Sequence, residues 1–114
     1  MKVTTSTIKQ LLIENAPSLD PIRVMLENYN LGQGRITVTC YGRAWTAAWF
    51  AMGNETIEQF IASSGTDYIL GNMVSHMTPG LKANKKHEEV YLTRIIDAVK
   101  VAIVMQNTET KDAE

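Results

Sequence analysis

Few side chains in this sequence have the type and spacing that metal binding requires. The chain has one cysteine, Cys40, and two histidines, His76 and His87, which stand on different predicted elements. A structural zinc site needs about four such ligands brought together. The run His87-Glu88-Glu89 lacks the second histidine of a zinc protease helix, because Tyr91 stands at that position. We therefore expect two solvated histidines, no metal site and no cofactor.

Nucleophilic catalysis is not indicated either. A reactive Cys40 would need a nearby base and an exposed, electropositive setting, whereas the predicted sheet buries it beside Val24 and Trp45. The segment Gly32-Gln33-Gly34 resembles part of a phosphate-binding loop, but it joins two antiparallel strands and opens no helix. The chain thus has no recognisable catalytic set, and we expect a protein that is not an enzyme.

Aromatic and basic residues alternate through the middle of the chain, and they form the candidate binding surface. Such a surface can stack the bases of a single-stranded nucleic acid, or anchor a protein interface, where tyrosine, arginine and methionine are enriched. A third possibility is that another helix, such as the amino-terminal one, covers it. A protein partner (including a second copy of the chain) and a covered core are each favoured over nucleic acid. The candidate binding residues are Arg23, Met25, Tyr29, Arg35, Tyr41, Arg43 and Phe50.

A three-stranded antiparallel meander is expected to position these residues. Polar and apolar residues alternate with period two over residues 22–29, 35–41 and 44–50, and glycine-bearing turns separate the three runs. The loops are expected at residues 30–34 and at Gly42-Arg43, the latter as a two-residue hairpin turn that takes glycine first.

The two turns together predict the faces of the sheet. If Tyr41 pairs with Ala44 and Tyr29 pairs with Arg35, the aliphatic residues and both tryptophans fall on one face. The threonines and the candidate binding residues then share the opposite face, which we expect to be open. The predicted buried set is Val24, Leu26, Ile36, Val38, Cys40, Trp45, Ala47 and Trp49.

Four helices are expected around the sheet. Residues 7–15, TIKQLLIEN, have helical spacing and a capping box, and prolines follow them. A helix containing Ile57, Phe60 and Ile61 is expected after a cap at Asn54 or Thr56, before Ser63-Ser64-Gly65.

The other two helices follow further along the chain. Residues 66–77 suit a short helix with Leu70, Met73, Val74 and Met77 on one face, and Pro79-Gly80 breaks the chain before a polar linker. The last and longest helix shows an apolar stripe that belongs against the sheet, made of Leu92, Ile95, Ile96, Val99, Ala102 and Ile103.

These elements predict a single α+β domain over residues 1–107, with a three-stranded antiparallel meander, helices packed on one face and a long C-terminal helix. Residues 108–114 are expected to form a disordered tail. The net charge of −1 over 114 residues argues against a protein that holds duplex DNA mainly by neutralising phosphates. One cysteine, no secretory pattern and an apolar stretch interrupted by Lys100 favour a soluble cytoplasmic protein with no membrane segment.

The run from Cys40 to Trp49, CYGRAWTAAW, followed by Ala51-Met52-Gly53, resembles a pattern of small enterobacterial phage and prophage proteins. Residues 56–60 and Asp67-Tyr68 fit the same pattern, and the resemblance covers roughly residues 19–73. It carries over no functional residue. It implies a phage accessory protein that acts in the bacterial cytoplasm by binding a host or defence-system protein, as an anti-CRISPR-like inhibitor would. A single-stranded nucleic-acid binder is the alternative.

Overall fold

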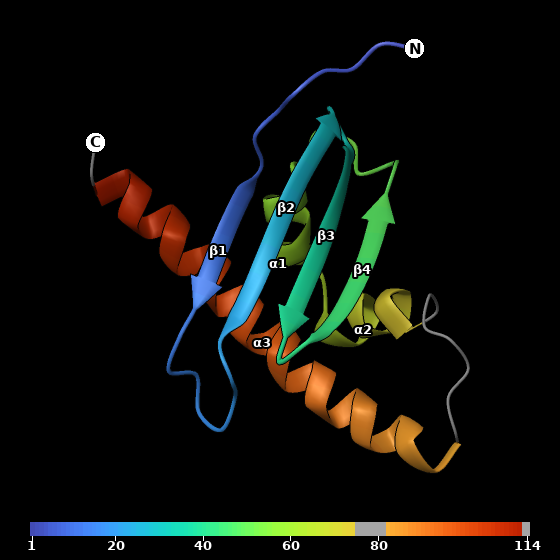
Figure 1. Ribbon diagram of the computed structural model, residues 1–114. Helices are drawn as coiled ribbons and strands as arrows, with labels where there is room; N and C mark the ends of the chain where they lie inside the picture. The colour runs from blue at the N-terminus through green and yellow to red at the C-terminus, as the bar shows by residue number, and fades with distance from the viewer. Residues whose placement is uncertain (75–81, 113–114) are drawn as a thin grey trace.

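A four-stranded antiparallel sheet with helices on one face forms the fold in the computed structural model, which describes residues 1–74 and 82–112, with side chains for 1–74 and 86–106. The strands lie side by side in chain order (Figure 1). They are β1 (Lys9–Ile13), β2 (Ile22–Asn30), β3 (Gln33–Cys40) and β4 (Arg43–Trp49). The helices are α1 (Ile57–Ser63), α2 (Thr66–Val74) and α3 (Lys82–Asp112). The predicted α+β class and long C-terminal helix are confirmed, but the sheet has four strands instead of three.

The additional strand comes from the segment for which the sequence predicts a helix over residues 7–15, and that prediction is wrong. Lys9 lies opposite Leu26 and Ile13 lies opposite Ile22, so the segment pairs with β2 along its whole length. Leu11 and Ile13 pack against the core from the covered face. A helix of nine residues is marginal by itself, whereas pairing with a formed sheet satisfies the backbone and buries alternate side chains.

The strand faces are predicted correctly although the pairing is not. Val38 lies opposite Trp45 and Leu26 lies opposite Ile36, so each pairing differs from the predicted one by two residues. For β3 and β4 the cause is the second turn, where Tyr41 and Gly42, with φ of 50° and 77°, form the two-residue connection in place of Gly42-Arg43. For β2 and β3 the cause is the first loop, because Asn30 already pairs with Gln33. A shift of two residues keeps every side chain on its face. All eight residues of the predicted buried set are buried.

The loop between β2 and β3 is shorter than predicted, and a hydrogen bond joins it to the segment that follows β4. It consists of Leu31 and Gly32, since Asn30 already pairs with Gln33. The carbonyl of Gly32 accepts a hydrogen bond of 2.8 Å from the amide of Met52. The loop between β2 and β3 and the segment after β4 are therefore tied together at this end of the sheet.

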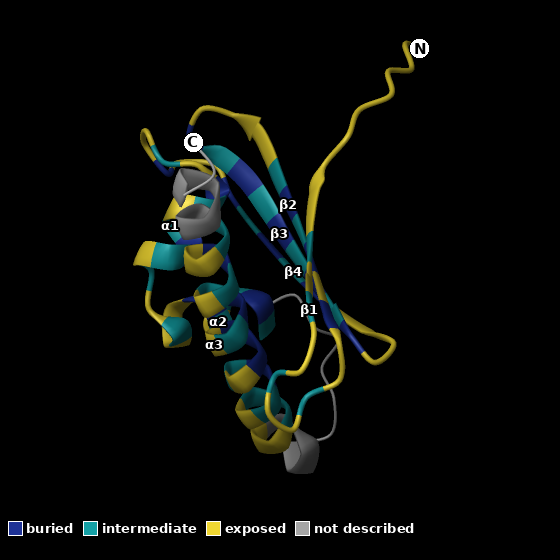
Figure 2. Cartoon of the chain, turned by 90° about the vertical axis from the view of Figure 1, so that its left-hand side faces the viewer, coloured by how far each residue is buried: buried dark blue, intermediate teal, exposed yellow. Residues whose placement is uncertain are grey.

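The core lies between the sheet and the three helices (Figure 2). Helix α1 begins with the predicted cap: Thr56 and Gln59 form a capping box. The side-chain oxygen of Asn28 accepts a further hydrogen bond of 2.8 Å from the amide of Ile57, which joins β2 to the start of α1. Ile57 and Ile61 are buried as expected.

Helix α2 confirms the predicted helix as far as Val74, although it buries Ile69 and Met73. The remainder of that helix, His76, Met77 and the break at Pro79-Gly80 lie outside the described residues. Helix α3 begins within the predicted linker, and its backbone continues to Asp112, through most of the segment predicted as a disordered tail. Once a helix is nucleated, each added residue gains a backbone hydrogen bond, which accounts for the extension.

The predicted stripe of α3 is buried except for Ala102, which is partly exposed. Within the described ranges, no helix is both long and apolar enough to cross a membrane.

Candidate functional site

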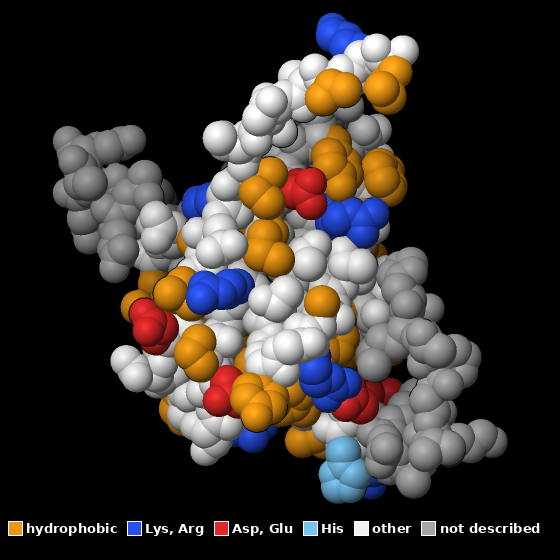
Figure 3. Space-filling model, in the orientation of Figure 1, with side chains coloured by type: hydrophobic (Ala, Val, Ile, Leu, Met, Phe, Trp, Pro, Cys, Tyr) orange, Lys and Arg blue, Asp and Glu red, His pale blue; other side chains and the backbone are white. Residues whose placement is uncertain are grey.

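The face of the sheet opposite the helices is open. All three helices lie on the other side of the sheet (Figure 2), and the segment before β2 is an edge strand that leaves this face uncovered. Thr37, Thr39, Thr46 and Ala48 are partly exposed there. The possibility that an amino-terminal helix covers this face is therefore wrong for the described residues. Hydrophobic and positively charged side chains are interspersed on it (Figure 3).

Four residues of this face form a cluster at the end of the sheet near the first loop; we call Tyr29, Arg35, Thr46 and Phe50 the aromatic–arginine cluster. The guanidinium of Arg35 donates to the hydroxyl of Tyr29 over 3.0 Å and to the hydroxyl of Thr46 over 2.9 Å. The rings of Tyr29 and Phe50 are stacked, with centroids 6.2 Å apart and planes at 18°. Arg35 is thus held in place while both rings remain exposed.

Two local irregularities bring the aromatic rings together. Tyr29 lies in a bulge of β2, because Asn28 pairs with Gly34 and Asn30 already pairs with Gln33. Phe50 follows the end of β4, in the segment that the Gly32 to Met52 hydrogen bond fastens to the first loop. Neither residue takes part in the regular strand pairing, yet the two rings stack on each other.

Arg23 and Met25 also lie on the open face, further along β2. Arg23 is exposed between Leu12 of β1 and Thr39 of β3, and Met25 is partly buried between its neighbours on those strands. The predicted positions of these two residues on the open face are confirmed.

Tyr41 and Arg43 are not part of the aromatic–arginine cluster. Tyr41 lies in the turn at the other end of β3, about 20 Å from the cluster at the usual rise per strand residue, and is exposed. Arg43 lies on the covered side, where it forms an ion pair with Glu88 of α3 and its guanidinium lies 5.1 Å from the ring of Trp45. The alternating pattern did not reveal this, because the predicted turn was one residue off.

Cys40 is buried, as predicted, and its contacts are structural. Its sulfur lies 3.2 Å from the hydroxyl of Tyr91 on α3. The hydrogen bond to Cys40, together with desolvation by burial, raises the pKa of Tyr91 to about 12. Among the described residues, no three histidine, cysteine or acidic side chains gather in a way that could hold a metal ion.

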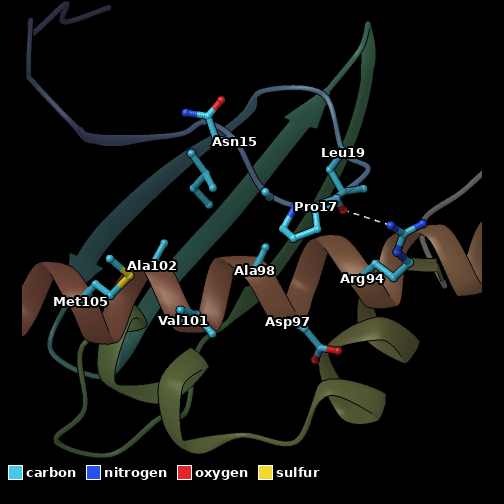
Figure 4. Close-up of a pocket in the computed structure, with 11 residues that line it drawn as sticks. Asn15, Pro17, Leu19, Arg94, Asp97, Ala98, Val101, Ala102 and Met105 are labelled. Carbon is cyan, nitrogen blue, oxygen red and sulfur yellow. Dashed lines mark hydrogen bonds between the residues drawn. The ribbon is translucent and has the colours of Figure 1, made fainter.

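A second surface, which the sequence did not reveal, is a groove between the β1–β2 loop and α3 (Figure 4). It has a volume of about 560 Å³ and mainly apolar walls, including Leu19, Ala98 and Val101. At one end Arg94 donates a hydrogen bond of 3.1 Å to the carbonyl of Pro17. The sequence did not predict this groove because it predicted a helix over residues 7–15, although Leu11 and Ile13 also have the spacing of a strand.

Comparisons with known proteins place the chain in a family without adding a function. Neither the curated proteins nor the solved structures give a match. One family model does match: Phage_phiTE_072, described as a phage family, over residues 1–80. That match spans β1 to α2 and therefore includes the whole sheet. The chain belongs to this phage family.

Proposed function

We propose that this phage-family protein is a non-catalytic binding protein that recognises a host or defence-system protein through its open sheet face. The observation on which the proposal depends is the aromatic–arginine cluster: two exposed stacked rings beside an arginine that two hydrogen bonds hold in one orientation. Rigid tyrosine and arginine side chains lose little conformational entropy on binding, which is why such residues dominate interface energetics.

The composition of the surrounding face also favours a protein partner. Threonines occupy the centre of the sheet, and Met25, Arg23 and Leu12 extend the surface toward β1. A small-residue floor with an aromatic group at one end and mixed polar groups around it suits a partner that lays a flat or convex surface on the sheet. The chemistry proposed is binding without covalent change, as for an inhibitor that blocks its target by occupation.

The geometry gives less support to single-stranded nucleic acid. Tyr41, one of the three aromatic residues among the candidate binding residues, lies at the far end of the sheet. Arg43 is paired with Glu88, and Glu27 lies directly opposite Arg35, so two of the three arginines expected near the rings have a carboxylate close by. A groove that follows a phosphate backbone needs several unpaired cations along one path.

The experiment that tests the proposal is affinity capture from a lysate of the bacterial host, with partners identified by mass spectrometry. Tyr29→Ala combined with Phe50→Ala removes both rings of the cluster, and Tyr41→Ala is the matched control because it removes an exposed tyrosine elsewhere. We expect a host protein that wild type and Tyr41→Ala retain and the double variant loses. Equal retention by all three proteins would contradict the proposal.

A second measurement distinguishes the protein partner from the alternative, binding of single-stranded nucleic acid. Affinity for single-stranded oligonucleotides is measured across a salt series with the same three proteins. Binding that weakens steeply with salt and depends on Tyr29 and Phe50 would replace the protein partner with nucleic acid. We expect no such binding at low salt.

A further inference from the structure

Strand β1 is an edge of the sheet whose outer side has no neighbouring strand in the part of the chain that the structure describes. Its residues Lys9–Ile13 pair with β2 only. The backbone N–H and C=O groups that point outward from an edge strand are a template for another strand. Many proteins prevent such pairing with bulges, prolines or charges at the centre of the edge strand. Strand β1 has none of these between Gln10 and Ile13.

The segment before β1 is available to lengthen this edge strand. Residues 1–8 are exposed and have no regular secondary structure, and they project past β2 (Figure 1). Val3, Ile8 and several threonines give the segment a strong preference for strand conformation. The side chains of Ile8 and Leu12 are 51% and 47% exposed. A partner strand on the outer side of β1 would pair these residues and cover the two apolar side chains.

Helix α3 also reaches beyond this edge. With 31 residues it is about 46 Å long, whereas four strands span only about 20 Å. The helix crosses behind the sheet obliquely, and its C-terminal turns pass β1 (Figure 1). Val101 and Met105, in this part of α3, are 58% and 57% exposed. Cavities of about 560 and 390 Å³ lie between β1, its following loop and α3.

We propose that the occupant of this edge is a second copy of the chain, with β1 pairing antiparallel to β1 of its partner around a two-fold axis. The two sheets then form one continuous sheet, and the protruding part of each α3 lies beneath the edge of the other copy. An interface of this kind is self-complementary, because the same surface contributes from both sides. It uses main-chain hydrogen bonds for affinity and side-chain matching for register.

Two of the registers open to β1 bring unfavourable side chains together. Residues that lie directly opposite one another in an antiparallel pair share a face of the sheet. The two-fold axis must therefore lie between the two copies of one residue, which then face each other. An axis at Lys9 sets two lysines opposite one another, which is destabilising. An axis at Leu11 sets Ile8 opposite Glu14 of the second copy, which pairs an apolar side chain with a carboxylate.

The register centred on Gln10 avoids both the lysine pair and the pairing of Ile8 with Glu14. Ile8 then lies opposite Leu12 of the second copy on the open face, so the two apolar side chains left exposed on this edge cover each other. Lys9 lies opposite Leu11 on the covered face, where the aliphatic stem of the lysine can cover the leucine while its ammonium stays in water. Glu14 lies opposite Ser6. The two glutamine side chains meet at the axis, where amide groups can hydrogen-bond to each other.

Changing Gln10 tests the axis directly. Gln10 is exposed, so Gln10→Lys and Gln10→Glu should leave the fold of each copy intact, while each sets like charges opposite one another in the dimer. Sedimentation equilibrium of the full chain over a concentration series should show a dimer for wild type. The dimer dissociation constant of each variant alone should be at least about fivefold higher than that of wild type. An equal mixture of the two variants should regain the wild-type dimer, because lysine and glutamate then meet at the axis.

Asn54→Lys, an exposed change in the loop after β4, is the charge control and should sediment as wild type does. A wild-type chain that remains monomeric throughout the series would overturn the proposal. A dimer that neither Gln10 variant weakens, or that the mixture does not restore, would also overturn it. The Tyr29→Ala, Phe50→Ala protein should remain dimeric, so this proposal and the proposed function can fail independently.

Discussion

The indole N–H of Trp49 donates a hydrogen bond of 3.0 Å to the hydroxyl of Tyr68. This bond connects the last residue of β4 to α2, and Phe60 of α1 packs against both rings. The motif tryptophan is therefore the point where the end of the sheet meets two helices. Its polar atom has a partner, which lets so large a side chain be buried without cost to the N–H group.

Removing the acceptor of this bond should destabilise the protein. We expect Tyr68→Phe to lower the free energy of unfolding by about 1 kcal/mol, because the buried indole N–H loses its partner. Urea denaturation measures the change. Tyr41→Phe removes a hydroxyl from an exposed turn and should change stability by less than about 0.5 kcal/mol. Equal effects of the two substitutions would show that the Trp49 bond contributes nothing.

Two glycines with positive φ allow the contribution of a close contact to be separated from backbone strain. A Cβ on Gly32 would lie 2.4 Å from the carbonyl oxygen of Gly53, whereas a Cβ on Gly42 would meet nothing within 4 Å. Gly42→Ala should cost about 1 kcal/mol from its φ of 77° alone. Gly32→Ala should cost clearly more, about 2 kcal/mol or above, because it also displaces the segment that carries Phe50. Thermal or urea unfolding of both variants gives the comparison, and equal losses would rule out the contact.

Asn28 should be important for the start of α1. Its side chain accepts from the amide of Ile57 and donates to Glu58 over 2.8 Å each. We expect Asn28→Ala to cost about 0.5 to 2 kcal/mol, the range found for lost helix caps. Asn30→Ala, which removes an exposed bond of 3.3 Å to Gln33, is the control and should be nearly neutral. Similar urea midpoints for the two variants would contradict a capping role.

The raised pKa of Tyr91 predicts how it ionises. In a titration followed by tyrosinate absorbance, the phase with a midpoint at about pH 12 should disappear in Tyr91→Phe. In Cys40→Ala the midpoint should fall, because the hydrogen bond to Cys40 is the main cause of the shift.

The same shift predicts a dependence of stability on pH. The folded-state pKa lies above the ordinary value of 10.0, so the hydrogen bond contributes fully below pH 10.0 and is lost as the pH rises through about 12. The stability difference between wild type and Tyr91→Phe should therefore shrink over that range. A difference that stays constant would show that the Tyr91 proton is not linked to folding.

The sequence predicted the sheet faces well because alternation depends only on which residues are apolar. Val38 and Trp45 face the core whether they pair with each other or with neighbours two residues away, so an error in the turn left the faces intact. The misplaced turn between β3 and β4 did affect the predicted binding surface. It left Tyr41 and Arg43 in the predicted surface, although a turn with positive φ at Tyr41 places them away from Tyr29.

The other error arose where two periodicities fit the same short segment. Ile8, Leu11 and Leu12 suit a helix, whereas Leu11 and Ile13 suit a strand, and five to nine residues are too few to separate the patterns. Pairing with β2 decides between them, and that information lies in another part of the chain. The groove beside α3 and the free edge could not be predicted without it.

The order of the sheet has a consequence for how the chain folds. Each strand pairs with the strand next to it in sequence, and the turns after β2 and β3 contain two residues each. Sheet formation therefore requires only short loop closures, whose entropic cost is small, and a topology of this kind favours rapid folding. The longest closure in the sheet is the loop of eight residues between β1 and β2, so β1 is the strand whose pairing costs most in loop entropy.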